Sequence, residues 1–378
     1  MKKKIVYVLH GLAAGGTEAF VLNVVSHLDR KKYDITFILA LDNNGKTHQF
    51  HEDKVLEQGI KIYRTCDLDG IKKWKLHYEK LKKLLIEKGP FDVIHCNMDL
   101  FNGINLMAAK KAGIPVRICH SHNSESQYST SFLKKIMSRT YRIFMRKMIY
   151  KYSTNMLGCS ELANDYLYGE NWKNDARCKV LYNGIDLKKF RFHDKIKETE
   201  RKNIMTIGRF GEQKNPFFLL EILIELLNIR KDINFSWVGD GELRKPIEER
   251  VKEEHLEKHI HFLGRREDIP ELLQQNDFFL FPSLFEGLPI TLIEAQASGL
   301  ECFISDTITK EVNVGLCQYL SLEKTAKEWA VYISEQLDNR DKKGYDAKLL
   351  DQFDIKNTVR RLEGEYPKVC VNLQTDVR

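Results

Sequence analysis

The feature that most constrains this chain is an alternation of short β-rich apolar segments with amphipathic segments, which runs twice along the sequence. Seven strands are predicted in the first half, over residues 5–9, 35–41, 61–64, 93–96, 117–120, 156–159 and 180–182. Five follow in the second half, over 204–207, 234–238, 260–262, 278–281 and 302–305, with helices predicted over 216–229, 243–254, 270–275 and 289–298. Strands that alternate with helices favour parallel sheets covered by helices. We therefore predict an α/β protein built from two doubly wound units.

A strongly charged stretch over residues 191–202 separates the two runs of alternation. A chain of 378 residues is long for one hydrophobic core and suits two domains. We predict a first domain over 1–190, a linker over 191–202 and a second domain over 203–352. Two such units that face each other leave a cleft lined by the carboxyl ends of strands, which is where open α/β sheets bind ligands.

Composition excludes several classes of protein. Hydrophobic residues make up 43% of the chain and charged residues 30%, which excludes disordered and collagen-like chains. No segment approaches the roughly 18 to 20 consecutive apolar residues of a membrane span. The apolar run after the N-terminal lysines is too short for the core of a signal peptide. The eight cysteines form no Cys-x-x-Cys pair, as expected of free thiols in a reducing compartment, so we predict a cytoplasmic protein without a zinc site.

The charge is distributed unevenly along the chain. Residues 1–190 carry 32 Lys and Arg against 19 Asp and Glu, whereas the remainder carries 28 against 34. A basic first half indicates an anionic partner, either nucleic acid or a membrane surface, although lysine-rich surfaces also serve solubility alone.

One segment favours the membrane. Residues 130–152 contain seven basic residues and no acidic one. The spacing of Lys135, Arg139, Arg142 and Arg146 places them in one stripe of a helix predicted over 132–152, with apolar residues opposite. We predict that this helix meets an anionic membrane and that no nucleic acid is bound. In the alternative interpretation, the apolar side packs on the first domain and the stripe is merely solvated.

A glycine-rich loop follows the first predicted strand. Gly15 and Gly16 lie where a helix is expected to begin, and their amides could cradle a phosphate. The same sequence would also suit a tight turn that binds no phosphate. The spacing Gly-x3-Gly-Gly does not match Gly-x-Gly-x-x-Gly, which disfavours NAD-dependent oxidation.

The second domain carries the more informative residues. Arg209 and Lys214 follow its first strand, just before a helix that Pro216 begins, and such a pair can bind a pyrophosphate. Further along, Glu286 lies in a turn and Glu294 in the following helix. Amides at that helix N-terminus can bind phosphate, while the two carboxylates accept hydroxyls from a sugar and a ribose. Taken separately, each charge could also be an ordinary solvated side chain.

These motifs together resemble the large family of retaining GT-B glycosyltransferases, the glycosyl transferases group 1, which makes bacterial capsules, exopolysaccharides and lipopolysaccharides. The resemblance rests on Glu-x7-Glu at 286–294, Gly-Arg-x4-Lys at 208–214, Gly-Asp-Gly at 239–241 and Asn-Gly-Ile-Asp at 183–186. It covers essentially the whole chain. It implies two Rossmann-like domains that face each other across a cleft, and a C-terminal helix over 353–378 that crosses back to the first domain.

The resemblance also implies roles for individual residues. Arg209 and Lys214 neutralise the donor pyrophosphate, Glu294 binds the ribose, and Glu286 contacts the transferred sugar. The remaining donor-binding residues are Gly15, Gly16, Gly239, Gly264, Arg265, Gly287, Leu288 and Pro289. A histidine after the fifth strand of the first domain faces the reacting sugar; His122 is favoured over His120, although the spacing does not fix the alignment.

The family further implies transfer from a nucleotide-sugar, with uridine as the expected base, to a lipid-linked or saccharide acceptor at the inner face of the cell membrane. Because Arg209 and Lys214 can stabilise the departing diphosphate, we predict that neither a metal ion nor another cofactor is required. Two rival functions remain on this fold: a nucleotide-sugar epimerase, and a non-catalytic sensor of sugar nucleotides.

Overall fold

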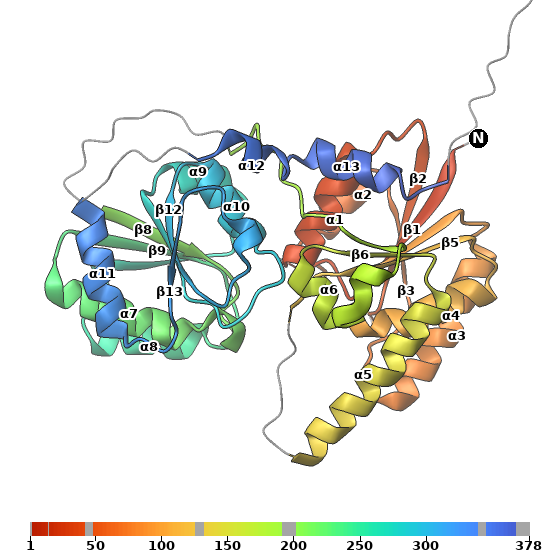
Figure 1. The fold of residues 1–378 in the computed structure, drawn as a ribbon, viewed down its shortest axis with the longest axis horizontal. Coiled ribbons are helices and arrows are strands. Elements are labelled where there is room, and N and C mark those ends of the chain that lie inside the picture. The colour runs from red at the N-terminus through yellow and green to blue at the C-terminus, as the bar shows by residue number, and fades with distance from the viewer. Residues whose placement is uncertain are drawn as a thin grey trace, which may run out of the picture. The chain divides into compact units, whose positions relative to one another are not determined.

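The computed structural model describes residues 2–13, 15–41, 48–124, 132–190, 202–338 and 345–367. The chain divides into two compact units (Figure 1). The first comprises Met1–Asn123, Tyr128–Leu181 and Thr358–Arg378, and the second comprises Ser124–Gln127 and Tyr182–Asn357. The predicted linker at 191–202 lies, except for Lys202, outside the described residues.

The first unit contains a seven-stranded parallel sheet of order β3-β2-β1-β4-β5-β6-β7. Its strands are β1 (Lys3–Leu9), β2 (Tyr33–Leu39), β3 (Lys61–Arg64), β4 (Val93–Cys96), β5 (Val116–Ser121), β6 (Asn155–Gly158) and β7 (Cys178–Val180). Its helices are α1 (Gly16–His27), α2 (Glu52–Glu57), α3 (Ile71–Glu87), α4 (Asn102–Lys111), α5 (Phe132–Tyr152) and α6 (Glu161–Tyr168).

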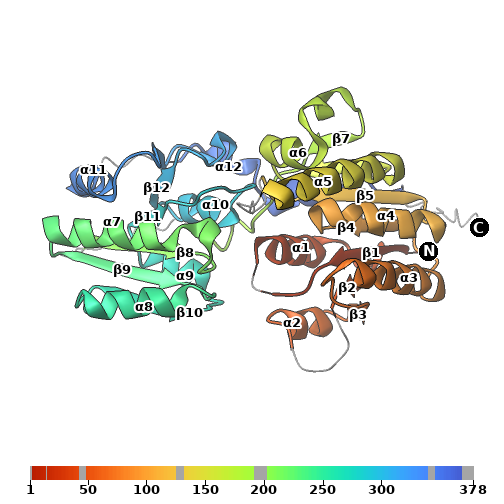
Figure 2. The same ribbon diagram turned by 90° about the horizontal axis from the view of Figure 1, so that it is seen from below.

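The sheet of the first unit has helices on both faces. Every residue from Ile5 to Leu9 is buried, as expected for a central parallel strand covered on both sides. Val6 and Val8 pack into one core with residues of α3, α4 and α5, and Figure 2 shows these three helices next to one another. Tyr7 lies on the other face, because successive side chains of a strand alternate between faces.

The last helix returns to the first unit, which confirms the predicted crossing. After α13 (Ile355–Glu363), the hydroxyl of Tyr366 lies 2.8 Å from that of Tyr7, and both rings are buried. Glu365 forms a 2.7 Å ion pair with Lys179 and accepts a 2.6 Å hydrogen bond from Asn155.

The second unit contains a six-stranded parallel sheet of order β10-β9-β8-β11-β12-β13. Its strands are β8 (Lys202–Ile207), β9 (Ile233–Val238), β10 (Ile260–Gly264), β11 (Phe278–Phe281), β12 (Glu301–Ser305) and β13 (Cys317–Leu320). Its helices are α7 (Pro216–Ile229), α8 (Arg244–Glu253), α9 (Ile269–Gln274), α10 (Ile290–Ala297), α11 (Ala326–Asp338) and α12 (Ala347–Asp351). The prediction of two parallel α/β units is confirmed, although β13 and α11 were not foreseen.

No helix in the described part of the chain combines the length and apolarity that a membrane span requires.

Candidate active site

The predicted donor-binding residues of the second unit gather at one edge of its sheet. Strands β10, β9, β8 and β11 are neighbours in that order and run parallel. Their carboxyl ends therefore lie side by side, and the loops that follow them form one group. Gly239, Gly264 and Arg265 lie in this group together with the segments 208–215 and 282–289.

Two glycines allow the loops after β8 and β9 to touch. Gly239 has a φ of +139°, and a Cβ on it would collide with the carbonyl oxygen of Gly208. The amide of Gly208 donates a 3.0 Å hydrogen bond to Val238, and the amide of Phe210 donates another of 3.0 Å to Asp240. A Cβ on Gly241 would likewise collide with the backbone of Phe210, so larger residues at Gly239 and Gly241 would separate the two loops.

Lys214 and Glu286 form the centre of the group. The Nζ of Lys214 lies 2.5 Å from Oε1 of Glu286, and their side chains are 24% and 8% exposed. The same ammonium stands 4.5 Å from the ring centroid of Phe281. Gln213 donates to the carbonyl of Phe285 at 3.0 Å and to Oε2 of Glu286 at 3.3 Å. The cation predicted for the pyrophosphate thus lies against the carboxylate predicted for the sugar.

Arg209 occupies a more open position. It forms a 2.8 Å ion pair with Glu242, and the two side chains are 72% and 53% exposed. Arg265, predicted near the base, lies 3.7 Å from Asp240 and is also half exposed. Arg209 and Lys214 therefore hold different carboxylates, one at the surface and one inside.

Helix α10 begins at the end of the loop that carries Glu286, after Gly287 and the buried Leu288. Pro289 precedes its first turn, and no described side chain caps this N-terminus, which leaves its dipole available to an anion. Glu294 follows within the helix. Burial raises the pKa of Glu294 to about 8, and its carboxyl has no hydrogen-bond or ion-pair partner among the described residues. Glu294 is half-buried, and a half-buried carboxyl without a partner costs stability, which is typical of a group kept for a ligand.

The glycine loop of the first unit ends in a helix, as predicted. Helix α1 begins at Gly16, and Gly15 precedes it in extended conformation. Close by, burial raises the pKa of Glu18 to about 7. Glu18 was not predicted as a site residue, because an acid in the first turn of a helix is common on helix-dipole grounds alone.

His122 and His120 lie in a column of buried imidazoles in the first unit. His120 is fully buried and its Nδ1 lies 3.0 Å from Nε2 of His95, whereas His122 keeps 8% of its surface exposed. The His120 and His122 ring centroids are 4.3 Å apart. Burial lowers the pKa of His95 and of His122 to about 3 and holds that of His120 well below its ordinary value, so all three imidazoles are neutral at physiological pH.

Asn97 fixes the tautomer of His122. Its amide nitrogen donates to the carbonyl of His95 at 3.1 Å, which turns its Oδ1 toward Nε2 of His122 at 2.9 Å. Nε2 must then carry the proton, and Nδ1 is an acceptor without a partner among the described residues. Asp99 accepts from the amide of His122 at 3.0 Å. Neither Asn97 nor Asp99 was anticipated, because both lie about 25 residues from His122 on another strand end.

The predicted basic stripe needs correction at Arg146. Helix α5 has the predicted bounds. The guanidinium of Arg146, however, donates to the carbonyls of Tyr166 and Leu167 near the end of α6. Arg142 stacks 5.3 Å over the Tyr166 ring, and Arg139 is exposed. The side chain of Lys135 lies outside the described residues. Arg146 is a structural residue because helix ends offer unsatisfied carbonyls to a cation.

Comparison with known proteins identifies the family of the chain. Residues 188–348 match the family model described as glycosyl transferases group 1, and residues 14–189 match the model of glycosyltransferase family 4. The chain is 34% identical over 346 residues to EpsF of Bacillus subtilis (strain 168), a protein named as a glycosyltransferase, with 88% of this chain and 87% of that protein covered.

Two further matches extend over nearly the whole chain. The UDP-Gal:alpha-D-GlcNAc-diphosphoundecaprenol alpha-1,3-galactosyltransferase of Escherichia coli is 24% identical, with 98% of each chain covered. The crystal structure of HepE of Anabaena in complex with UDP superposes with a TM-score of 0.74 at 16% identity, covering 96% of this chain and 99% of that one, and shows the same fold. From the identity to EpsF over most of both chains, together with the two family models, the chain belongs to the glycosyl transferases group 1 and is a glycosyltransferase.

Proposed function

We propose that this enzyme transfers a sugar, with retention of configuration, from a UDP-sugar to a lipid-linked saccharide in the synthesis of a bacterial surface polysaccharide. The name of the Escherichia coli relative, which specifies a UDP-sugar donor and a diphosphoundecaprenol acceptor, supports both substrate classes. UDP in the HepE structure supports the choice of base. Arg139 and the lysines of α5 support a location of the enzyme at the inner face of the cell membrane.

The observation that carries the proposal is the pairing of Lys214 with Glu286 in front of helix α10. A donor diphosphate placed at the N-terminus of α10 meets Lys214 on one side, and its sugar meets Glu286 on the other. Glu294, one turn further along the same helix, is the group for the ribose hydroxyls. Arg209, being exposed, can leave Glu242 and fold onto the diphosphate at little cost.

The transfer step follows from these placements. The bond between the anomeric carbon and the diphosphate oxygen breaks, and the acceptor oxygen forms the new bond on the same face of the sugar. The departing diphosphate oxygen takes the acceptor proton, so no enzymic base is required. Negative charge grows on the diphosphate as the bond breaks, and Lys214, Arg209 and the amides of α10 stabilise that charge. In the first unit, Nδ1 of His122 offers an acceptor for a sugar hydroxyl.

Titration of UDP into the protein tests the donor site first. We expect Glu294→Gln to weaken binding of UDP much more than binding of the ribose-free pyrophosphate. The matched control is Glu221→Gln on the exposed face of α7. Equal affinity of UDP for wild type and Glu294→Gln would refute the assignment of the ribose site.

Product analysis separates the proposed reaction from its rivals. A panel of labelled UDP-sugars is incubated with lipid-linked saccharides, and the anomeric configuration of the product is read by NMR. Transfer with retention supports the proposal. An isomerised nucleotide-sugar would identify an epimerase, and binding without turnover would identify a sensor. A product of inverted configuration would exclude bond formation on the face that the diphosphate leaves.

A further inference from the structure

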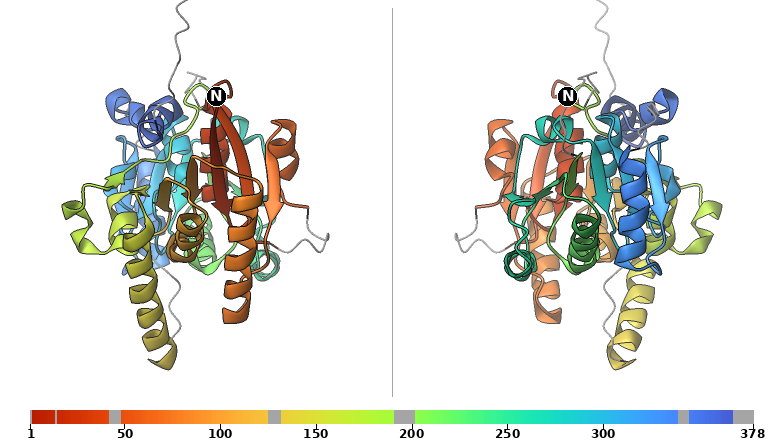
Figure 3. Two further views of the ribbon diagram at one scale, coloured as in Figure 1. Left: turned by 90° about the vertical axis from the view of Figure 1, so that its right-hand side faces the viewer. Right: turned by 90° about the vertical axis from the view of Figure 1, so that its left-hand side faces the viewer.

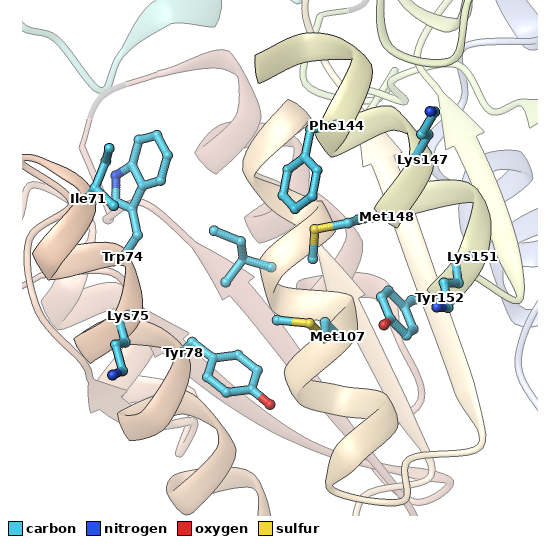
Figure 4. Close-up of a pocket in the computed structure, with 11 residues that line it drawn as sticks. Ile71, Trp74, Lys75, Tyr78, Met107, Phe144, Lys147, Met148, Lys151 and Tyr152 are labelled. Atoms are coloured by element: carbon cyan, nitrogen blue, oxygen red, sulfur yellow. The ribbon is translucent and has the colours of Figure 1, made fainter. Parts of the chain in front are cut away.

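The first unit carries an apolar groove on its surface, bounded by α3 and α5 and floored by α4 (Figure 4). Its volume is about 540 Å³. From α3, Ile71, Trp74 and Tyr78 line it, at positions that fall on one side of a helix. Figure 3 shows α3 and α5 as the long helices of this unit.

Helix α5 supplies the opposite wall through Phe144, Met148 and Tyr152, again spaced along one side of a helix. Met148 is buried in the core, which fixes the direction in which this wall faces. Phe144 is nevertheless 59% exposed, and Ile71 across the groove is 76% exposed. Large apolar side chains gathered at one exposed site indicate a binding surface rather than chance exposure.

The rim of the groove is uniformly basic. Lys75 on α3 and Lys147 and Lys151 on α5 line it, and all three are exposed. None of them forms an ion pair with a described residue. Three cations without counter-charges around an apolar floor complement a ligand that has an anionic head and a hydrocarbon tail.

We propose that this groove is a lipid site, through which the first unit docks on an anionic phospholipid membrane. Phosphates of the headgroups lie on Lys75, Lys147 and Lys151, and a lipid hydrocarbon chain lies on Trp74 and Phe144. Apolar burial and electrostatic attraction act together, as stable interfacial binding requires. The site differs from the predicted stripe, because neither Lys147 nor Lys151 belongs to that stripe.

A second copy of this chain suits the groove less well. Docking two copies through this face would bring two sets of three unpaired lysines together, and like charges repel. A membrane supplies the opposite charge. The inference extends the proposed membrane location, but it requires neither donor binding nor transfer.

Tryptophan fluorescence gives a direct test. Trp74 lines the groove, whereas the other three tryptophans, Trp172, Trp237 and Trp329, are at most 6% exposed. Vesicles of phosphatidylglycerol whose acyl chains carry bromine are expected to quench the fluorescence of the wild type. Trp74→Phe should abolish that quenching while retaining sedimentation with the vesicles. Sedimentation without any Trp74-dependent quenching would overturn the lipid site.

Matched variants localise the binding. Ile71→Glu with Phe144→Glu, and separately Lys75→Glu with Lys147→Glu, should lower partitioning into anionic vesicles about tenfold or more. Phe217→Glu on α7, where the side chain is 46% exposed, and Lys245→Glu on α8, where it is 85% exposed, serve as controls for added or reversed charge. Groove variants that bind vesicles like the wild type would contradict the proposal, as would equal wild-type binding to phosphatidylcholine.

Two further measurements distinguish lipid binding from donor binding and from self-association. UDP titration of each groove variant should give the wild-type affinity, which shows that the protein is folded. If the wild type did not bind UDP, the proposed function would be wrong, but the proposed lipid site would be unaffected. A dimer that Phe144→Glu dissociates, in a protein that ignores vesicles, would instead assign the groove to a second copy.

Discussion

Lys214 is bonded through its Nζ to Oε1 of Glu286 at 2.5 Å, although the two residues are 72 positions apart and follow different strands. The pair joins the group assigned to the donor diphosphate to the group assigned to its sugar. Donor binding must therefore separate Lys214 from Glu286. Phosphate oxygens compete with Glu286 for the ammonium, and sugar hydroxyls compete with Lys214 for the carboxylate. The exchange leaves the ammonium paired with phosphate and the carboxylate hydrogen-bonded to hydroxyls, which limits the cost of desolvating them.

Replacing Lys214 tests this pair through stability and turnover together. Lys214→Ala leaves Glu286 buried without its cation, so we expect the free energy of unfolding to fall by about 1–3 kcal/mol. Turnover should fall on the order of 10² to 10³ through the lost charge on the diphosphate. Lys214→Met combined with Glu286→Gln should recover stability but not activity. If the stability effects of Lys214→Met and Glu286→Gln, each also measured alone, simply added in the double variant, the two residues would not interact.

Arg209 is expected to behave differently, because its ion pair with Glu242 is exposed. Arg209→Ala should unfold like the wild type, since an exposed pair contributes little. Its kcat should nonetheless fall on the order of 10², because charge builds on the diphosphate mainly as the glycosidic bond breaks. Arg209→Lys should also be impaired, since it keeps the charge but loses the planar fork. The control Glu242→Gln should retain turnover. A loss confined to KM would remove the claim about the transition state.

The sequence was sufficient where a signal is local. Strands such as β1 and β11 contain continuous apolar runs, and α7 begins at a proline, so their positions could be predicted. The Lys214–Glu286 pair, the Asn97–His122 bond and the Arg146 contacts with α6 could not, because each joins residues that only the folded sheet brings together. Helical spacing places the four cations of the predicted stripe on one side of α5. It cannot show that Arg146 is the one whose guanidinium bonds to backbone carbonyls of α6. Likewise β13 is short and mostly only partly buried, which weakens its apolar signal.

Metal independence remains a prediction. Arg209, Lys214 and the amides of α10 can together balance the charge that a metal ion would otherwise carry. We therefore expect transfer to proceed at an unchanged rate after dialysis against EDTA, measured with a purified UDP-sugar and acceptor. Activity that EDTA abolishes and manganese restores would show that these groups are insufficient.

The three buried imidazoles predict an acid limit to stability. Burial lowers the pKa of His95 and His122 to about 3 and that of His120 well below its ordinary value, whereas an unfolded histidine has a pKa near 6.5. Between these values the unfolded chain binds more protons, so the free energy of unfolding falls as pH drops below about 6.5. Each histidine contributes about 1.4 kcal/mol per pH unit there. Urea titrations at pH 7, 6 and 5 measure the slope. His261→Gln, which removes an exposed histidine, should leave it unchanged, and a flat profile in the wild type would contradict the burial.

Glu294 predicts the opposite pH dependence. Its folded pKa of about 8 lies above the value near 4.5 of an unfolded glutamate. Between those values the native state binds the extra proton, so this residue lowers the stability progressively as pH rises from about 4.5 to 8. Glu294→Gln should therefore unfold like the wild type at pH 5 and be more stable than it at pH 8. The same carboxyl accepts ribose hydroxyls best when ionised, so UDP binding to the wild type should release a proton below pH 8. Calorimetric titrations at pH 7 in buffers of different ionisation enthalpy count that proton, which Glu294→Gln should remove. If both proteins released equal numbers of protons, the ribose would not lie on Glu294.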